Sequence, residues 1–144
     1  MTYAQTMELK GIRLGMSQFE IQDLHGQLPL QGLTIAGIAS KYPINPDFLD
    51  GRLEQFEFFF DSSEFNRMLV VVQKKYPGMR CTNSRVSTVA GASFVQTECT
   101  LNGSAGTLSL SRLVSDVSTS VLTMTSRELI ESRRKIMKAG DKDI

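Results

Sequence analysis

The sequence has little of the side-chain chemistry on which metal sites and acid–base catalysis depend. Its 144 residues include one histidine, two cysteines and no tryptophan. His25 stands before Gly26 at the expected end of a helix, where an imidazole more often caps the helix than ligates a metal. The glycine-rich run at 103–106 lacks the lysine and the following helix of a phosphate-binding loop. We therefore expect no metal site, no cofactor and no catalytic residue, and we predict that the protein is not an enzyme.

Long apolar runs are also missing. No stretch reaches the eighteen or so apolar residues that a membrane-spanning helix requires. The first five residues have neither the basic start nor the apolar centre of an export signal. As the sequence stands we expect a cytoplasmic protein, or a periplasmic one if a signal has been removed.

The composition is that of a single globular domain. Hydrophobic residues make up 41% of the chain and charged residues 22%, both ordinary values. A chain of this length buries enough surface to form a core without a metal or a disulfide. We therefore predict one domain over residues 1–144.

The net charge of +1 conceals an uneven distribution along the chain. Residues 1–64 hold nine acidic and four basic side chains, whereas residues 65–144 hold six acidic and twelve basic ones. If the halves remain apart in the fold, the surface is dipolar and suits a charged partner or a second copy of the chain. If they interleave, the asymmetry cancels.

Three helix starts carry a capping residue followed three positions later by a glutamate. The first, at Ser17, predicts a short helix that ends at 25–26. The second, at Asp61, predicts a helix to about residue 76 with an apolar stripe at the i, i+3, i+4 and i+7 positions. The third, at Thr125, predicts a helix over 125–139.

Between the helices the apolar pattern alternates with a period of two, which is typical of strands. Strands are predicted at 33–39 and 52–60, and four more at 80–89, 92–101, 106–113 and 117–124. The last four are separated by short turns, which predicts consecutive hairpins. The expected fold class is therefore α+β, an antiparallel meander with helices packed on one face. The other face, rich in Ser and Thr, is expected to be open to water.

The two cysteines fall in the first of these hairpins. If its turn is centred on Ala90, opposed residue numbers sum to 180, and Cys81 faces Cys99 closely enough to form a disulfide in an oxidising compartment. If the register sums to 181, the two thiols point to opposite faces. Either two ordinary strand thiols or a disulfide fits the sequence.

The predicted C-terminal helix is the most strongly charged segment. Its apolar residues form a stripe that arginines interrupt, and we expect it to dock on the sheet with a basic outer face. The candidate contact residues for an acidic protein are Arg127, Arg133, Arg134, Lys135 and Lys138. Nucleic acid is a less favoured partner, because the isoelectric point of about 7.8 is not strongly basic and the predicted polar strands carry no aromatic platform.

The loop at 41–51 is a second candidate contact site. It is stiffened by two prolines and carries Tyr42, Ile44 and Phe48. Apolar side chains on a rigid loop lose little entropy on docking and often anchor interfaces. The same side chains can instead close the edge of the core, and the sequence does not decide between these alternatives.

Two short segments resemble a known family. The run GIRLGMS at 11–17, with the short helix that follows, resembles the opening of the BamE/SmpA–OmlA superfamily of small bacterial α+β domains. The FLDGRL segment at 48–53 and the KKYPG segment at 74–78 resemble uncharacterised bacterial and prophage proteins. The resemblance covers about the first eighty residues, so a BamE-like core is expected at about 7–80, followed by the meander and the C-terminal helix.

The resemblance implies helices on an antiparallel sheet that serves protein–protein contact, as in outer-membrane assembly factors and β-lactamase inhibitory proteins. The chain departs from the envelope lipoproteins of this family in lacking a signal peptide and a lipid-anchoring cysteine. We expect a non-enzymatic protein-binding module of bacterial or phage origin, an inhibitor or an accessory factor. The alternatives are nucleic-acid contact through the basic helix and an envelope-associated assembly factor. A homodimer is also compatible with the sequence.

Overall fold

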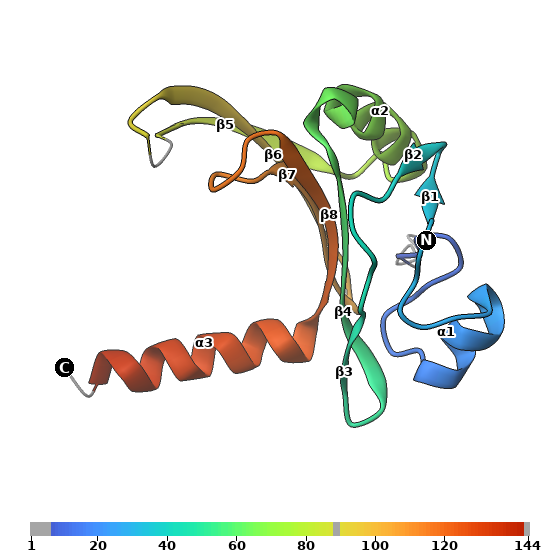
Figure 1. The fold of residues 1–144 in the computed structure, drawn as a ribbon. Helices are drawn as coiled ribbons and strands as arrows, with labels where there is room; N and C mark the ends of the chain where they lie inside the picture. The colour runs from blue at the N-terminus through green and yellow to red at the C-terminus, as the bar shows by residue number, and fades with distance from the viewer. Residues whose placement is uncertain (1–6, 88–89, 143–144) are drawn as a thin grey trace.

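The computed structural model describes residues 7–87 and 90–142, and there it confirms the α+β class with an antiparallel sheet (Figure 1). Two predictions fall on residues outside these ranges: that residues 1–5 carry no export signal, and that the strand predicted at 80–89 includes its last two residues. The elements in chain order are α1 (Gln18–His25), β1 (Thr34–Ile35), β2 (Ile38–Ala39), β3 (Asp47–Leu49), β4 (Arg52–Asp61), the 3-10 helix η1 (Ser62–Glu64), α2 (Phe65–Lys75), β5 (Arg80–Ser87), β6 (Ser93–Asn102), β7 (Gly106–Arg112), β8 (Thr119–Ser126) and α3 (Arg127–Lys142).

The main sheet has the strand order β3-β4-β8-β7-β6-β5. Strands β5 to β8 pair with one another consecutively and antiparallel, which confirms the predicted meander. The last strand of the meander, β8, also pairs with β4, so that Phe58 lies opposite Leu122. This long-range pairing places β8 inside the sheet, with a neighbour on each side.

Alternation along β4 defines two faces of the sheet. Phe56, Phe58 and Phe60 are fully buried on one side, which we call the core face. The rings of Phe58 and Phe60 lie 6.1 Å apart between centroids. Burial of rings of this size is a dominant stabilising contribution in a domain. The core face of β4 continues into β8 and β7 through Leu122 and Leu110.

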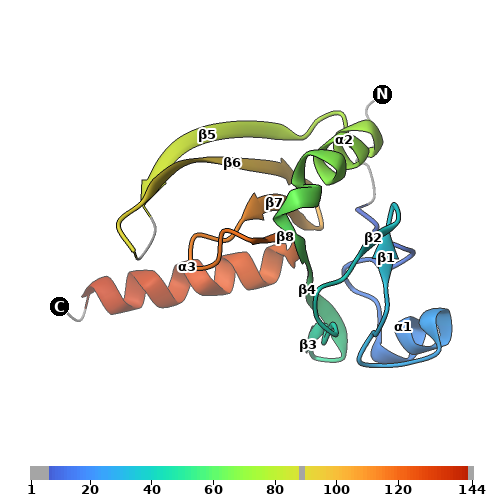
Figure 2. The ribbon, with the colours of Figure 1, turned by 45° about the horizontal axis from the view of Figure 1, so that its top comes forward.

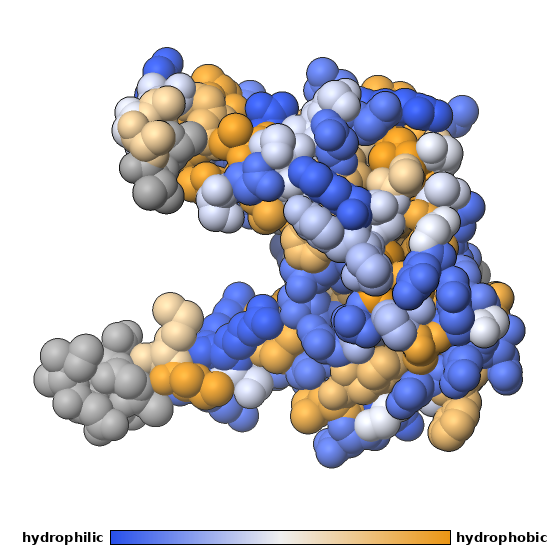
Figure 3. Space-filling view, viewed as in Figure 1, coloured by the Kyte–Doolittle hydropathy of each residue, from blue (hydrophilic) through white to orange (hydrophobic). Residues whose placement is uncertain are grey.

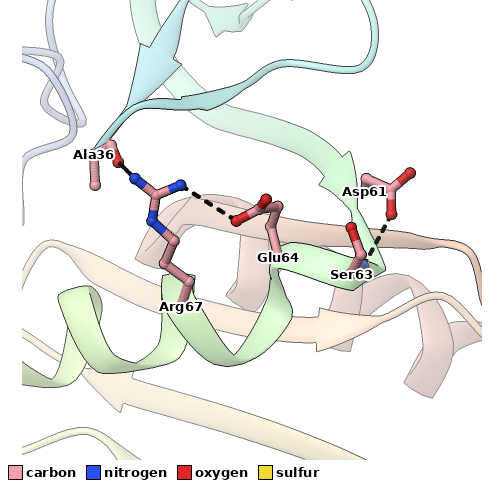
Figure 4. Close-up of polar contacts among 5 residues, drawn as sticks. All are labelled: Ala36, Asp61, Ser63, Glu64 and Arg67. Carbon is pink, nitrogen blue, oxygen red and sulfur yellow. Dashed lines mark hydrogen bonds and ion pairs between the residues drawn. The ribbon is translucent and has the colours of Figure 1, made fainter.

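Helix α2 covers the upper part of the core face as the sequence predicts. Its buried residues, Phe65, Met68 and Val72, follow the expected helical spacing. The start of the helix differs from the predicted capping box. The Asp61 carboxylate accepts a hydrogen bond from the Ser63 amide at 2.9 Å and begins η1, while Glu64 pairs with Arg67 at 3.4 Å (Figure 4). Arg67 also donates to the Ala36 carbonyl at 3.0 Å and so ties α2 to the β1–β2 turn.

The N-terminal segment and α1 cover the rest of the core face. The predicted capping box of α1 is confirmed: Ser17 Oγ accepts from the Glu20 amide at 3.1 Å, and Glu20 accepts from the Ser17 amide at 3.2 Å. Gly26 ends the helix in the left-handed conformation. The buried Tyr76 hydroxyl joins α2 to this segment by donating to the Glu8 carbonyl at 2.9 Å.

Two local predictions are corrected. The strand predicted at 33–39 is a tight hairpin of β1 and β2, because Ala36 and Gly37 both have positive φ, at 53° and 79°, as a two-residue hairpin turn requires. The cap of the last helix is Ser126 and not Thr125. Ser126 Oγ accepts from the Leu129 amide at 3.1 Å, while Thr125 is still part of β8.

The predicted docking of the C-terminal helix on the sheet is wrong. Helices α1 and α2 lie on the core side of the sheet, whereas α3 projects from its opposite side (Figures 1 and 2). Strand β8 ends at Ser126 and α3 begins at Arg127, so no loop residue allows the helix to turn back against the strands. Residues 131–138 are all exposed.

Candidate protein-interaction site

The face of the sheet opposite the core, which we call the outer face, carries the hydroxyl-rich side chains that the sequence predicts. The register places Glu57 opposite Thr123 and Ser109 beside Thr123 on this face. Ser109 is half-buried, but Thr123 is buried on the interior strand β8. The predicted openness to water therefore holds only in part: Glu98 on β6 is exposed and the outward side chains of β7 are half-buried. On β8 the prediction is wrong, because Thr119, Val121 and Thr123 are buried.

The outer face forms the back of a hollow. In the space-filling view, α3 projects below this hollow and the hairpin of β5 and β6 projects above it (Figure 3). The loop at 113–118, between β7 and β8, lies on the hairpin side, at the opposite end of β8 from α3. The hollow is thus bounded by secondary structure on three sides and open on the fourth.

Hydrogen bonds from Arg127 hold the first turn of α3 to the turn between β6 and β7. The Arg127 amide donates to the Ala105 carbonyl at 3.1 Å, and its guanidinium donates to the Ser104 and Gly103 carbonyls at 3.3 and 2.6 Å. With the Ser126 cap, these bonds fix the direction in which the helix leaves the sheet. Arg127 therefore has a structural role, in addition to its predicted role in contact.

Beyond its first turn, α3 exposes apolar side chains. Ile136 and Met137 are 69% and 70% exposed, while Leu129 and Ile130 are half-buried. We call these four residues the α3 stripe, and Arg133 lies midway along it. Surfaces of this kind on a projecting helix are typical of helices that pack against another protein.

Glu57, on the outer face of β4, lies in a charged environment. Burial raises the pKa of the Glu57 carboxyl, the nearby Asp47 raises it further, and Arg133 opposes both effects by lowering it. Arg133 therefore acts electrostatically on the outer face from the middle of α3. Glu57 is not among the predicted contact residues, although its position between Phe56 and Phe58 in an alternating strand places it on the outer face.

The loop at 113–118 is shaped by Asp116. Its carboxylate accepts hydrogen bonds from the Ser118 hydroxyl at 2.6 Å and from the Thr119 hydroxyl at 2.8 Å, and these bonds lower the pKa of Asp116. Val114 and Val117 on the same loop are exposed. Only residues 114–116 are predicted as a turn, with Val117 at the start of the next predicted strand, and neither valine is among the predicted contact residues.

The predicted anchors on the 41–51 loop do not act together. Ile44 is buried and pairs with Leu30 through backbone hydrogen bonds, and Phe48 packs partly buried against the core cluster. These two side chains therefore close the edge of the core, which is one of the two alternatives that the sequence leaves open, and they do not anchor an interface. Tyr42 is 49% exposed and packs edge-on against Phe59 with ring centroids 6.0 Å apart. Its role in partner contact stays a prediction.

The cysteines adopt the register whose residue numbers sum to 180. Cys81 lies directly opposite Cys99, and a disulfide joins them. Cys99 is buried in the core, whereas Cys81 is exposed and its sulfur accepts a hydrogen bond from the α2 residue Gln73 at 3.5 Å. The bond therefore ties the outermost strand of the sheet to the core.

Other features of the described chain provide no stronger site. His25 Nε2 lies 3.0 Å from the Lys10 carbonyl, which fits a role in closing the end of α1. Two open, adjoining cavities of about 370 and 400 Å³ share Leu14, Gly15, Arg52 and Ala105. Among the residues with described positions, no three His, Cys, Asp or Glu side chains are grouped as metal ligands. In the same part of the chain, no helix is long and apolar enough to cross a membrane.

Comparison with known proteins adds no relative: no protein-family model, no curated protein and no solved structure matches the chain. The resemblance of residues 11–17 to the BamE-like superfamily, and of residues 48–53 and 74–78 to uncharacterised bacterial and prophage proteins, is therefore still a prediction.

Proposed function

We propose that the protein is a non-enzymatic protein-binding module, acting as an inhibitor or accessory factor, whose contact surface is the hollow between α3 and the outer face. The observation that supports this proposal is the exposure of Ile136 and Met137 on a helix that projects from the body. Isolated helices of about this length are marginally stable in water, and most helices in proteins depend on packing. A partner that covers the α3 stripe supplies that packing.

The other walls of the hollow suit a protein surface. Hydroxyl side chains on the outer face, such as Ser109, donate and accept hydrogen bonds, and Val114 and Val117 are exposed apolar side chains on the 113–118 loop. Protein interfaces combine apolar centres with polar surroundings in this way. The hollow is wide and open on one side, unlike the enclosed pockets that bind small molecules.

Nucleic acid is the second candidate partner, because Arg133, Arg134, Lys135 and Lys138 are all exposed. The charge of Glu57 and Asp47 near Arg133 disfavours a phosphate backbone in the hollow. Binding of duplex DNA or single-stranded RNA that falls steeply with salt concentration would support this second candidate.

The Cys81–Cys99 disulfide favours an oxidising compartment over the cytoplasm. In the envelope, the role of assembly factor that the BamE-like resemblance implies becomes the natural form of the proposed function. The redox state of the two thiols in cells of the source organism decides between the compartments.

Site-specific photo-crosslinking tests the proposed function. A benzophenone amino acid replaces Ile136 on α3 and, as a matched control, Val70 on α2, which is 65% exposed on the core side of the sheet. We expect a discrete crosslinked product in cells from position 136 and not from position 70. Equal products from both positions, or none from position 136, would contradict the proposal.

A further inference from the structure

The main sheet has two edge strands, and they differ in how open they are to further pairing. Strand β3 has three residues, and its register with β4 shifts after Asp47. Strand β5 has eight residues, which pair with β6 without a shift. Natural edge strands are usually protected by shortness, bulges, proline or lysine. Strand β5 has none of these, although it carries two arginines, and it is therefore the more open edge.

The backbone groups of β5 that face the open edge can be identified from the spacing of the strands. Opposed residues in an antiparallel pair alternate between hydrogen-bonded pairs, with Cα atoms about 5.5 Å apart, and non-hydrogen-bonded pairs at about 4.5 Å. The Cα atoms of Cys81 and Cys99 are 4.0 Å apart, so these residues form a non-hydrogen-bonded pair. The amides and carbonyls of Cys81, Asn83 and Arg85 therefore point away from β6. Within residues 7–87 and 90–142 no other group bonds to them, and β5 is the outermost strand in both views (Figures 1 and 2).

The side chains in the middle of β5 are polar and uncharged, and an arginine lies on either side of them. Thr82, Asn83 and Ser84 are all exposed. The Asn83 side-chain oxygen accepts a hydrogen bond from the Thr97 hydroxyl at 2.8 Å, which leaves the Asn83 side-chain NH₂ group without a partner in the described chain. A strand that fits this edge therefore has polar, uncharged side chains at its centre and places no positive charge opposite the arginines.

A second copy of β5 meets both requirements. The outward backbone groups belong to odd-numbered residues, so antiparallel pairing of two β5 strands places odd opposite odd, and opposed residue numbers have an even sum. Arg80 and Arg85 have an odd sum and are therefore never opposed. Two even sums, 166 and 168, give the longest overlap within the strand. The sum of 168 makes the two copies of Arg85 diagonal neighbours, which repel each other, whereas 166 keeps all the arginines apart.

We propose that two copies of the chain pair antiparallel through β5 and form one continuous sheet. In the register with the sum of 166, Asn83 faces Asn83 of the second copy on the two-fold axis, and Thr82 faces Ser84 of the second copy. Among the described strands each copy has one long free edge, so pairing stops at two copies. The contact is confined to one strand edge, which makes the dimer weak and reversible. This surface is separate from α3, so the inference does not depend on the proposed function.

Sedimentation velocity of the full chain over a range of concentrations tests the inference. We expect a monomer–dimer equilibrium with a dissociation constant in the micromolar range. The variants Asn83→Lys and Asn83→Asp each place two like charges opposite each other on the axis, and each should raise the dissociation constant at least about tenfold. An equimolar mixture of the two variants should restore the dimer, as a mixed species that native mass spectrometry identifies by its mass.

A matched control and a measurement without substitutions accompany these variants. Asn45→Lys makes the same change at an exposed position before β3, at the other edge of the sheet, and should leave the dimer unchanged. Circular dichroism checks that each variant is folded. In the wild-type protein, amide hydrogen exchange of Cys81, Asn83 and Arg85 should slow as the concentration rises, whereas exchange of the residues between them, whose amides bond to β6, should not change.

Several results would overturn the inference. These are a chain that is still monomeric at millimolar concentration, a dimer that Asn83→Lys does not weaken, a mixture of the two variants that does not associate, or growth of open-ended aggregates. A dimer strengthened by Asn83→Asp would place Asn83 opposite Arg85 and refute the register. A dimer lost in the double variant Ile136→Ser, Met137→Ser would place the contact on α3. Capture of a partner at position 136 by a chain that does not dimerise would retain the proposed function and refute this inference.

Discussion

Loss of the Cys81 thiol should open the disulfide that closes the hairpin of β5 and β6. The variant Cys81→Ala is the cleanest change, because Cys81 is exposed while its partner Cys99 is buried in the core. Cys99 keeps its volume in this variant, so no cavity forms. Reduction of the wild-type protein gives the same open hairpin without any substitution.

The expected loss follows from the length of the closed loop. The two cysteines are 18 residues apart, and closing a loop of this size in the unfolded chain corresponds to about 3 kcal/mol of stability. A change of this size lowers the melting temperature of a chain of this length by roughly 10 °C. Strand β5 is almost entirely exposed, so little packing compensates for the open hairpin.

Urea unfolding followed by far-ultraviolet circular dichroism measures the loss, since the chain has no tryptophan. The wild-type protein is compared with and without reductant, and Thr82→Ala, a neighbouring exposed position on β5, is the control. Cys81→Ala and reduced wild type should unfold at the same, lower urea concentration. Two titratable thiols in wild-type protein kept without reductant would refute the pairing. An unchanged urea midpoint after reduction would refute the loop-closure reasoning.

Three further changes test the core, the sheet and the outer face. Phe58→Ala should lower the free energy of unfolding by about 3–5 kcal/mol in urea, because the ring is fully buried against Phe60. Gly106→Ala should unfold the β7–β8 pair, because its methyl group would lie 2.0 Å from the Thr125 carbonyl oxygen, whereas Gly78→Ala, whose nearest atom is 3.4 Å away, should leave the melting temperature unchanged. Glu57→Gln should be more stable than wild type at neutral pH, because burial and Asp47 raise the pKa of Glu57. The raised pKa means that the wild-type protein recovers stability relative to this variant as pH falls toward 4.5, the ordinary value; a difference that does not vary with pH would refute this cause.

The features that sequence predicts are those with local causes. The two possible registers of the β5–β6 hairpin follow from the position of its turn, but the sequence leaves open which of them forms, and the structure has the one that pairs Cys81 with Cys99. The buried stripe of α2 follows from helical spacing, and the cap of α1 follows from the Ser17 and Glu20 pair.

The features that the sequence does not predict depend on residues far apart in the chain or on the way one element joins the next. The pairing of β8 with β4 joins residues far apart in the chain, such as Phe58 and Leu122. The projection of α3 depends on the absence of a loop after Ser126 and on Arg127 bonding to the turn between β6 and β7. An amphipathic pattern shows that a helix has an apolar side, but not whether its own sheet covers that side.

The free α3 stripe can be tested directly by the rate of methionine oxidation. Met137 is 70% exposed on α3, whereas Met68 and Met124 are fully buried in the core and serve as internal controls. With dilute peroxide and peptide mapping, we expect Met137 in the isolated protein to oxidise many times faster than the two core methionines. Protection of Met137 equal to that of Met124 in the isolated protein would contradict an open hollow and an uncovered stripe.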